Sequence, residues 1–393
     1  MLISIGLILI IGFGLYGVFV KLRLPGLLGL LLAGILLGPH AFDLIDPSLL
    51  AISADLREIS LIVILVRAGL SLDLKDLRKV GRPAILMSFV PATFEIAGVL
   101  LLAPLLLGVT LAQAAVIGTM LAAVSPAVIV PAMLKLMQQG YGQKKRVPQL
   151  VMAGATADDI YALVLFSSSL ALLQGGSFQL LTLLNIPLAA LTGIIGGLAT
   201  AFMLHQVFLR LHMRDTVKVL LILAAAFLLV GTESLAARFF PFSGLLAVMA
   251  LGITFLRLRG EVARRISGKF SKIWVAAELI LFVLLGAAVD VRYLLSAGLA
   301  AAAVIAGALL IRSLGTIVSL SGTNLNNREK LFCNIAYLPK ATVQAAVGAI
   351  PLTLGLPGGQ LILSIAVLSI LLTAPLGAIA IEKTSARLLA GDR

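Results

Sequence analysis

Charged residues are scarce in this sequence. They make up 12% of the 393 residues, whereas hydrophobic residues make up 61%. A soluble domain carries about 25% charged residues, and roughly 20 consecutive apolar residues span a bilayer. The composition therefore excludes a water-soluble globule and a disordered chain, and it predicts a polytopic membrane protein.

Other features are equally sparse, and each absence excludes a class. Aromatic residues reach only 6% and the single Cys333 excludes an intramolecular disulfide. The apolar runs lack the alternation of outer-membrane strands, so the spans are predicted to be helical. The sequence contains no G-x-x-x-x-G-K-[ST] loop and no long polar insertion, so nothing supports a nucleotide-driven pump. Any transport must then draw on ion gradients, and neither a cofactor nor an enzymatic activity is expected.

Apolar windows separated by polar breaks predict thirteen membrane helices. They lie at about 2–20, 25–38, 57–71, 83–107, 111–136, 148–174, 183–209, 217–233, 241–257, 274–290, 294–320, 329–354 and 360–381.

Basic residues alternate between the loops of this arrangement. One set of loops carries only Arg57, Arg238 and Arg292. Most other Lys and Arg residues fall in the alternate loops, at 21–23, 75–82, 135–146, 210–218, 257–272, 328–330 and 383–393. The positive-inside rule then places the C-terminus in the cytoplasm and the N-terminus outside. It also accounts for the net charge of +13 without nucleic-acid binding. The short C-terminal tail favours a bacterial inner membrane.

Five ionisable residues lie deep within predicted spans, listed here in chain order: Glu95, Asp158, Asp159, Arg312 and Lys340. A charge at this depth costs about 2.5–3.5 kcal/mol for Asp, Lys or Arg, so each is a functional hypothesis by default. Glu95 and Arg312 would each be costly alone, which predicts a buried ion pair between the fourth and eleventh spans.

Adjacent aspartates occupy the middle of the sixth span, in Thr156-Ala157-Asp158-Asp159. Neighbouring helical residues point about 100° apart, so one carboxylate is expected to face a pathway and the other a neighbouring helix. A buried ionised carboxylate needs a counter-cation, and a proton or Na⁺ can each serve. The alternative is that both aspartates pair with Arg or Lys and only tie helices together.

Two spans contain proline at mid-depth. The fifth reads Ser125-Pro126 with Pro131 one turn later, and the twelfth reads Pro339-Lys340-Ala341-Thr342. Proline removes a backbone donor, so both helices are predicted to break where freed carbonyls can line a cavity. Lys340 would then neutralise exposed helix C-terminal carbonyls. Corresponding breaks in two inverted halves are typical of transporters, whereas either proline alone would indicate a simple kink.

These motifs resemble a known family. Residues 66–73, Ser125-Pro126, Asp158-Asp159 and residues 338–346 look like those of sodium/proton antiporters of the monovalent cation:proton antiporter superfamily, closest to its NHA-type branch (solute carrier 9, subfamily B). The resemblance covers nearly the whole chain. It departs from the mammalian members at the N-terminus, where they carry an additional helix, which leaves the dimer interface open.

The resemblance implies a homodimer in which each protomer has a dimerisation domain and a six-helix core domain that moves like an elevator. Residues 1–82 would be dimerisation helices, 83–174 the first half of the core, 175–290 a linker helix with further dimerisation helices, and 291–393 the second half of the core with a short tail.

The resemblance also assigns roles to the site. It implies that Asp158 or Asp159 carries cation and proton at crossed fifth and twelfth helices, with Asp158 favoured for direct coordination. Ser125, Pro126, Lys340 and Thr342 would support the site, together with Thr156. The Glu95–Arg312 pair would stand in place of the lysine of electrogenic relatives.

Charge counting gives a mechanism. Three deep carboxylates against two deep cations leave about one negative charge, which one Na⁺ or one H⁺ neutralises. A neutral core can cross the membrane and a charged one is penalised, so the hypothesis is electroneutral one-for-one exchange of Na⁺ or Li⁺ for H⁺. If Lys340 releases a proton or both aspartates titrate, two protons per cation result. Glu278, near a predicted cytoplasmic mouth, is the candidate funnel residue.

Rival functions remain at this point. A K⁺/H⁺ antiporter, a cation channel and a transport-inactive sensor on the same fold are open. An intramembrane aspartyl protease is disfavoured, because its two aspartates come from different helices. Membrane lipids and a second copy of the chain are the expected partners; no nucleic acid or other protein is predicted.

Overall fold

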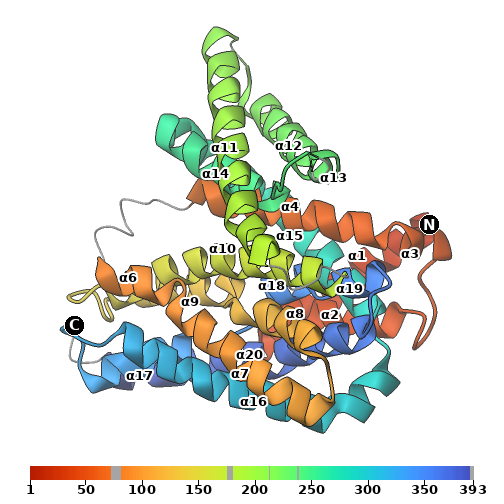
Figure 1. Ribbon diagram of the computed structural model, residues 1–393, viewed down its shortest axis with the longest axis vertical. Helices are drawn as coiled ribbons and strands as arrows, with labels where there is room; N and C mark the ends of the chain where they lie inside the picture. Colours follow the sequence, from red (N-terminus) through yellow and green to blue (C-terminus); the bar gives the residue numbers. More distant parts are fainter. Residues whose placement is uncertain (72–80, 175–179, 212, 237–238, 390–393) are drawn as a thin grey trace. The chain divides into compact units, whose positions relative to one another are not determined.

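The structure is a computed structural model that describes residues 1–71, 81–174, 180–211, 213–236 and 239–389. These residues form helices joined by short turns, with no strand among them (Figure 1). Eight helices are long and apolar enough to cross a membrane, and three shorter apolar helices cover Gly26–Leu37, Gly244–Leu258 and Thr342–Thr353. The all-helical membrane fold is confirmed, whereas the number thirteen stays a prediction. Lys75, Arg78, Lys79, Arg238 and Arg393 of the loop pattern, and the side chain of Thr156, lie outside the described residues.

Two compact units divide the chain. Unit 1 comprises Met1–Ala54, Lys75–Leu173 and Phe282–Arg393. Its helices are α1 (Leu2–Lys21), α2 (Gly26–Leu37), α3 (Pro47–Ala51), α6 (Arg82–Met87), α7 (Val90–Leu107), α8 (Leu111–Ala122), α9 (Pro126–Gln138), α10 (Val147–Leu173), α16 (Val291–Ser319), α17 (Asn327–Ala336), α18 (Thr342–Val347), α19 (Ile350–Thr353) and α20 (Gly359–Leu388). Both halves of the expected core fall in this unit, together with the first three helices. Their expected division into core and dimerisation domains stays a prediction.

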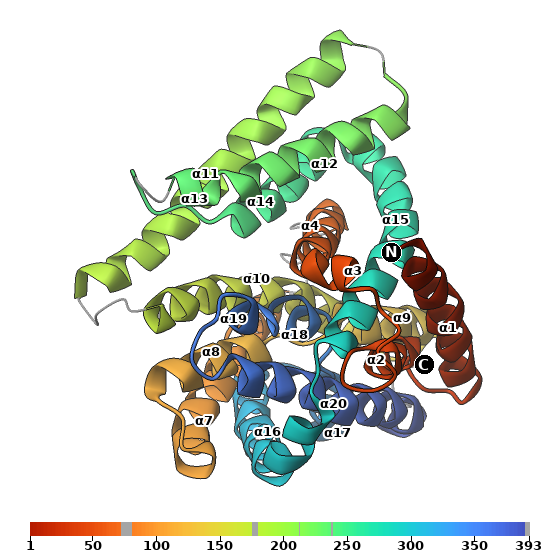
Figure 2. The same cartoon turned by 90° about the vertical axis from the view of Figure 1, so that its right-hand side faces the viewer.

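Helices from the two halves interleave within unit 1. Helix α7 packs along α16, α8 packs on α10, and α20 contacts α8, α16 and α17 (Figures 1 and 2). Small residues permit the close approach of α7 and α16: a Cβ on Gly315 would lie 2.9 Å from the Phe94 side chain. The halves are therefore packed against each other along their length.

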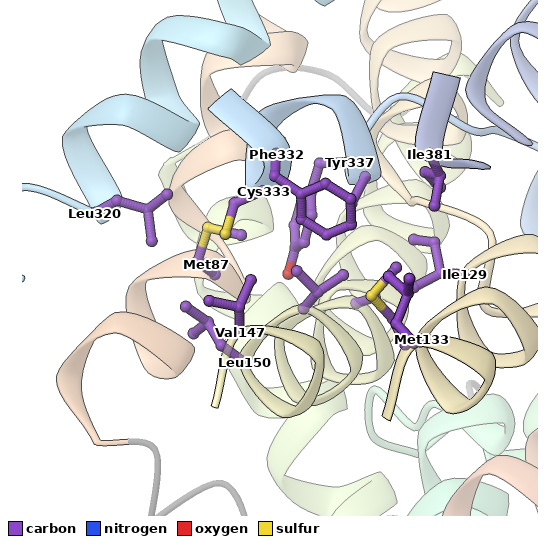
Figure 3. Packing of buried hydrophobic residues seen from close by; sticks show 14 of the residues in the cluster. Met87, Ile129, Met133, Val147, Leu150, Leu320, Phe332, Cys333, Tyr337 and Ile381 are labelled. Atoms are coloured by element: carbon purple, nitrogen blue, oxygen red, sulfur yellow. The ribbon is translucent and has the colours of Figure 1, made fainter. Parts of the chain in front are cut away.

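A cluster of fully buried side chains joins α6, α9, α10 and α17 (Figure 3). Met87, Val147, Phe332 and Tyr337 are all 0% exposed within it. Gly154 of α10 lies beneath Tyr337, because a Cβ there would come within 2.0 Å of the tyrosine hydroxyl. This packing fixes the position of Tyr337, the residue that follows the last residue of α17.

Unit 2 comprises Asp55–Leu74 and Gln174–Leu281. Its helices are α4 (Ser53–Ser71), α11 (Leu180–Arg210), α12 (Asp215–Gly231), α13 (Glu233–Ala236), α14 (Gly244–Leu258) and α15 (Gly260–Ala287), where α4 begins and α15 ends in unit 1. Helices α11 and α14 pack closely, since a Cβ on Gly197 would lie 2.2 Å from the Ala247 carbonyl oxygen.

The structure corrects one predicted boundary and refines one predicted span. Residues 260–273, predicted as a loop, form the first turns of α15. Their Arg and Lys residues lower the hydropathy but are good helix formers, so hydropathy alone misplaced the boundary. The predicted span 83–107 is confirmed as the membrane-length segment Arg82–Leu107, which is interrupted between α6 and α7 because Pro91 at the second position of α7 cannot donate to the preceding turn.

Candidate functional site

Both predicted helix breaks are present. Helix α8 ends at Ala122 and α9 begins at Pro126, while α17 ends at Ala336 and α18 begins at Thr342. The two breaks touch, because the Ser125 amide donates to the Pro339 carbonyl at 2.9 Å. Each break thus places a helix C-terminus and a helix N-terminus inside the unit, where their partial charges need partners.

Side chains from the second half cap the C-terminus of α8. The Gln344 amide nitrogen donates to the carbonyls of Met120 at 2.9 Å and Ala123 at 3.0 Å. The Arg312 guanidinium donates to the Ala122 carbonyl at 2.5 Å. The carbonyls that α8 cannot satisfy internally are therefore used by donors from α16 and α18.

A buried ionic network is centred on Arg312, which is 1% exposed. Its Nη1 lies 2.5 Å from Glu95 Oε2, and its Nη2 lies 3.0 Å from Asp158 Oδ2. The ring of Tyr337 lies 5.5 Å from the guanidinium carbon, at cation–π distance. The structure thus brings together Glu95 and Arg312, as the sequence predicts, and adds Asp158 to the pair.

Lys340 lies in the second break and is also 1% exposed. Its ammonium is 2.6 Å from Glu95 Oε2, and its backbone amide donates to Thr373 Oγ1 of α20 at 2.8 Å. The sequence predicted that Lys340 would neutralise helix carbonyls; instead it neutralises Glu95, because Gln344 and Arg312 already occupy the carbonyls of α8.

The two aspartates of α10 have different surroundings. Asp158 is 0% exposed, and its Oδ2 accepts from both Arg312 and the Val124 amide, the latter at 3.1 Å. Asp159 is 8% exposed, and no cation of the described residues lies within 4 Å of its carboxylate. Asp158 is therefore the carboxylate that faces neighbouring elements, and Asp159 is the one whose charge is not paired there.

Several buried oxygens around the crossing have no hydrogen-bond partner among the described residues. These are Ser125 Oγ, Asp158 Oδ1, Asp159 Oδ1, Thr342 Oγ1, Gln344 Oε1 and the Tyr337 hydroxyl. Carboxylate, hydroxyl and amide oxygens are the donors that hard cations prefer. No group of three or more His, Cys, Asp and Glu forms a metal site in the described part of the chain.

Glu278 lies on α15, in unit 2. It is partly buried and interacts electrostatically with Arg67 of α4. Its predicted role in a funnel stays a prediction.

The sequence reasoning missed three contributors. Gln344 lies in the motif that carries the family resemblance, yet an amide in an apolar span gives no indication of which carbonyls it caps. Tyr337 and Thr373 look like ordinary residues of apolar helices. The only signal in the sequence is for Tyr337, which lies two residues before Pro339 of the second break.

Comparison with known proteins agrees with this geometry. Residues 6–384 match the family model described as "Sodium/hydrogen exchanger, transmembrane". Human sodium/hydrogen exchanger 9B2 is 36% identical over 384 residues, covering 93% of this chain and 70% of that protein. Human sodium/hydrogen exchanger 9B1 is 30% identical over 372 residues, covering 91% and 71%.

A solved structure has the same fold. The sodium proton antiporter MjNhaP1 from Methanocaldococcus jannaschii superposes with a TM-score of 0.84 over 98% of this chain and 97% of that one, at 22% sequence identity. The family match spans almost all residues, including both breaks and every member of the ionic network. The chain therefore belongs to the sodium/hydrogen exchanger family of membrane transporters.

Proposed function

We propose that this protein exchanges Na⁺ or Li⁺ for H⁺, and that the aspartates of α10 hold the two ions in turn. The observation that carries the proposal is the buried crossing. Three carboxylates and two cations meet there, beside hydroxyl and amide oxygens without partners among the described residues. A buried net negative charge needs a counter-ion, and either Na⁺ or H⁺ neutralises it.

The contacts favour Asp159 as the principal carrier, rather than the Asp158 that the family resemblance favours. Arg312 and the Val124 amide already stabilise the charge of Asp158. A cation at Asp158 must compete with the guanidinium, whereas Asp159 has no such competitor among the described residues. Asp158 would hold the crossing in shape and lend a second oxygen, with Ser125 and Thr342 contributing hydroxyls.

The loaded site would be neutral, which gives one-for-one exchange. We further propose an elevator movement of the core in a homodimer, with the C-terminus cytoplasmic and the N-terminus outside. The positive-inside rule assigns the loops of Arg82, Lys144 and Lys145 to the same side of the membrane. These residues line one cavity of unit 1, which supports the assignment and the orientation that follows from it. The bacterial inner membrane stays a prediction.

The decisive experiment compares wild type, Asp158→Asn and Asp159→Asn in dye-loaded proteoliposomes with Na⁺, Li⁺ and K⁺. We expect Asp159→Asn to abolish cation-driven pH change and Asp158→Asn to reduce it. Asp43→Asn is a matched control, because Asp43 is exposed and has φ 49°, which asparagine adopts readily. Undiminished cation exchange in both Asp158→Asn and Asp159→Asn would contradict the proposal.

Two further measurements distinguish the proposed function from the alternative functions. Exchange driven by K⁺ alone would assign a K⁺/H⁺ antiporter, and single-channel conductance in a planar bilayer would assign a channel. Electroneutrality is tested by clamping the membrane potential, since a rate that changes with voltage rules out the neutral scheme.

A further inference from the structure

A second polar site lies in unit 1, away from the aspartates. A cavity of about 390 Å³ is lined by the start of α6, the loop between α9 and α10, and the turn between α16 and α17. Its charged lining residues are Arg82, Lys144 and Lys145. All three side chains are cationic, and they come from two segments, Arg82 and the adjacent Lys144 and Lys145, that are far apart in the sequence.

The cations of the cavity are only partly neutralised. Lys145 lies 3.0 Å from Glu329, whose carboxylate also accepts from the Asn326 amide at 2.6 Å and so stays fixed at the start of α17. No carboxylate of the described residues lies within 4 Å of Arg82 or Lys144. Among the described residues, the lining therefore presents about two positive charges without a paired carboxylate to one partly open cavity.

The rest of the lining is mostly neutral and polar, and its Ser319, Ser321 and Thr323 hydroxyls donate to backbone carbonyls. The turn after α16 reads Ser321-Gly322-Thr323-Asn324, and Ser319 closes α16 beside it. Gly322 has φ +72°, and a Cβ placed there would lie 3.6 Å from an Arg82 guanidinium nitrogen. The turn thus runs directly beside that guanidinium, and it adds the Asn324 side-chain amide to the lining.

We infer that this cavity binds a phosphate monoester carried on a small organic group. A planar guanidinium and an ammonium are the side chains that recognise phosphate, and a dianionic monoester matches two uncompensated cations. The volume falls in the range of small-molecule sites and exceeds what one phosphate group requires. By the positive-inside rule this end of the unit faces the cytoplasm, where such a group is found on membrane lipids and on soluble metabolites.

The test titrates two ligands that share the headgroup. Glycerol 3-phosphate represents the free ester and dioctanoyl phosphatidic acid the lipid, with dioctanoyl phosphatidylcholine as the lipid control. Binding to the purified full chain in detergent is followed by calorimetry. We expect saturable binding of at least one monoester and none of phosphatidylcholine. Binding of both ligands assigns recognition to the headgroup alone, whereas binding of phosphatidic acid only assigns a lipid.

Two double variants locate the site. Arg82→Gln with Lys144→Gln should weaken binding at least tenfold. Arg328→Gln with Lys383→Gln removes the same charges from exposed positions outside the cavity and should change binding less than twofold. Absence of saturable monoester binding, or an equal loss in both double variants, overturns the inference. The cavity double variant should keep wild-type cation exchange in proteoliposomes without the ligand, so this result is independent of the proposed antiport.

Discussion

The two halves of the core make opposite contributions to the crossing. Helices α7, α8 and α10 of the first half supply acceptors, namely the carboxylates of Glu95, Asp158 and Asp159 and the carbonyls that end α8. Helices α16 to α18 of the second half, with the break between them, supply the donors Arg312, Lys340 and Gln344. The halves share a broken backbone but differ in side-chain chemistry, so Glu95 and Asp158 of the first half depend on cations of the second.

This difference between the halves gives the buried ionic network a structural role beside its proposed role in transport. A buried ion pair is not a large net gain, but removing one partner leaves the other without compensation. Every donor lost from the second half should therefore unbalance an acceptor of the first. The predictions below test that dependence, starting with the contact expected to matter most.

Arg312→Ala should have the largest effect. It leaves Asp158 with only the Val124 amide and frees the Ala122 carbonyl, which should cost about 3–5 kcal/mol in the free energy of unfolding. Chemical unfolding in detergent measures the loss. Arg328→Ala, an exposed arginine of the same unit, should stay within about 0.5 kcal/mol of wild type.

A double-mutant cycle sharpens this result. Adding Asp158→Asn to Arg312→Ala removes the stranded charge, so the double variant should lose clearly less than the sum of the single losses. Effects that add within about 0.5 kcal/mol would show that the two side chains are not coupled.

Gln344→Leu should cost about 2–3 kcal/mol, because carbonyls at the end of α8 lose their donor in a buried site. Gln344→Glu is the more demanding variant. It places a carboxylate beside a helix C-terminus and should be more destabilising than leucine, as measured by the same unfolding assay. A glutamate variant as stable as wild type would contradict capping by the amide.

The sequence predicted which residues form this site better than it predicted which of them contact one another. Prolines located both breaks, and the cost of burying charge singled out Glu95, Asp158, Asp159, Arg312 and Lys340. Which cation meets which acid depends on the register of helices that are distant in sequence, so Lys340 was assigned to carbonyls instead of Glu95. Gln344 escaped notice as a cap because an amide costs less to bury than a charge and so gives a weaker signal.

The start of α15 was misplaced for a related reason. Hydropathy locates the part of a helix that lipid would surround, and it misses polar turns such as residues 260–273 that continue the same helix. Within the confirmed segment Arg82–Leu107, the interruption between α6 and α7 was not predicted, because Pro91 lies in a strongly apolar run.

Gly154→Ala tests an uncharged contact between the halves. The added methyl would overlap the Tyr337 hydroxyl, so the core must shift at a cost of about 1–3 kcal/mol. Gly298→Ala is the matched control: no atom lies within 4 Å of its Cβ position, and alanine in a helix should stabilise the chain by up to about 1 kcal/mol. Equal effects of the two alanines on unfolding would rule out tight packing beneath Tyr337.

Thr373→Val should have the smallest effect, because it breaks a contact within the second half alone. The Thr373 hydroxyl accepts from the Lys340 amide and donates to the Ser369 carbonyl, so valine leaves one buried amide without its acceptor, at a cost of about 1 kcal/mol. Thr384→Val removes a hydroxyl that bonds only within α20 and should be near neutral. If Thr373→Val destabilised the chain as much as Arg312→Ala, the second break would depend on its own half, and the proposed dependence between the halves would be wrong.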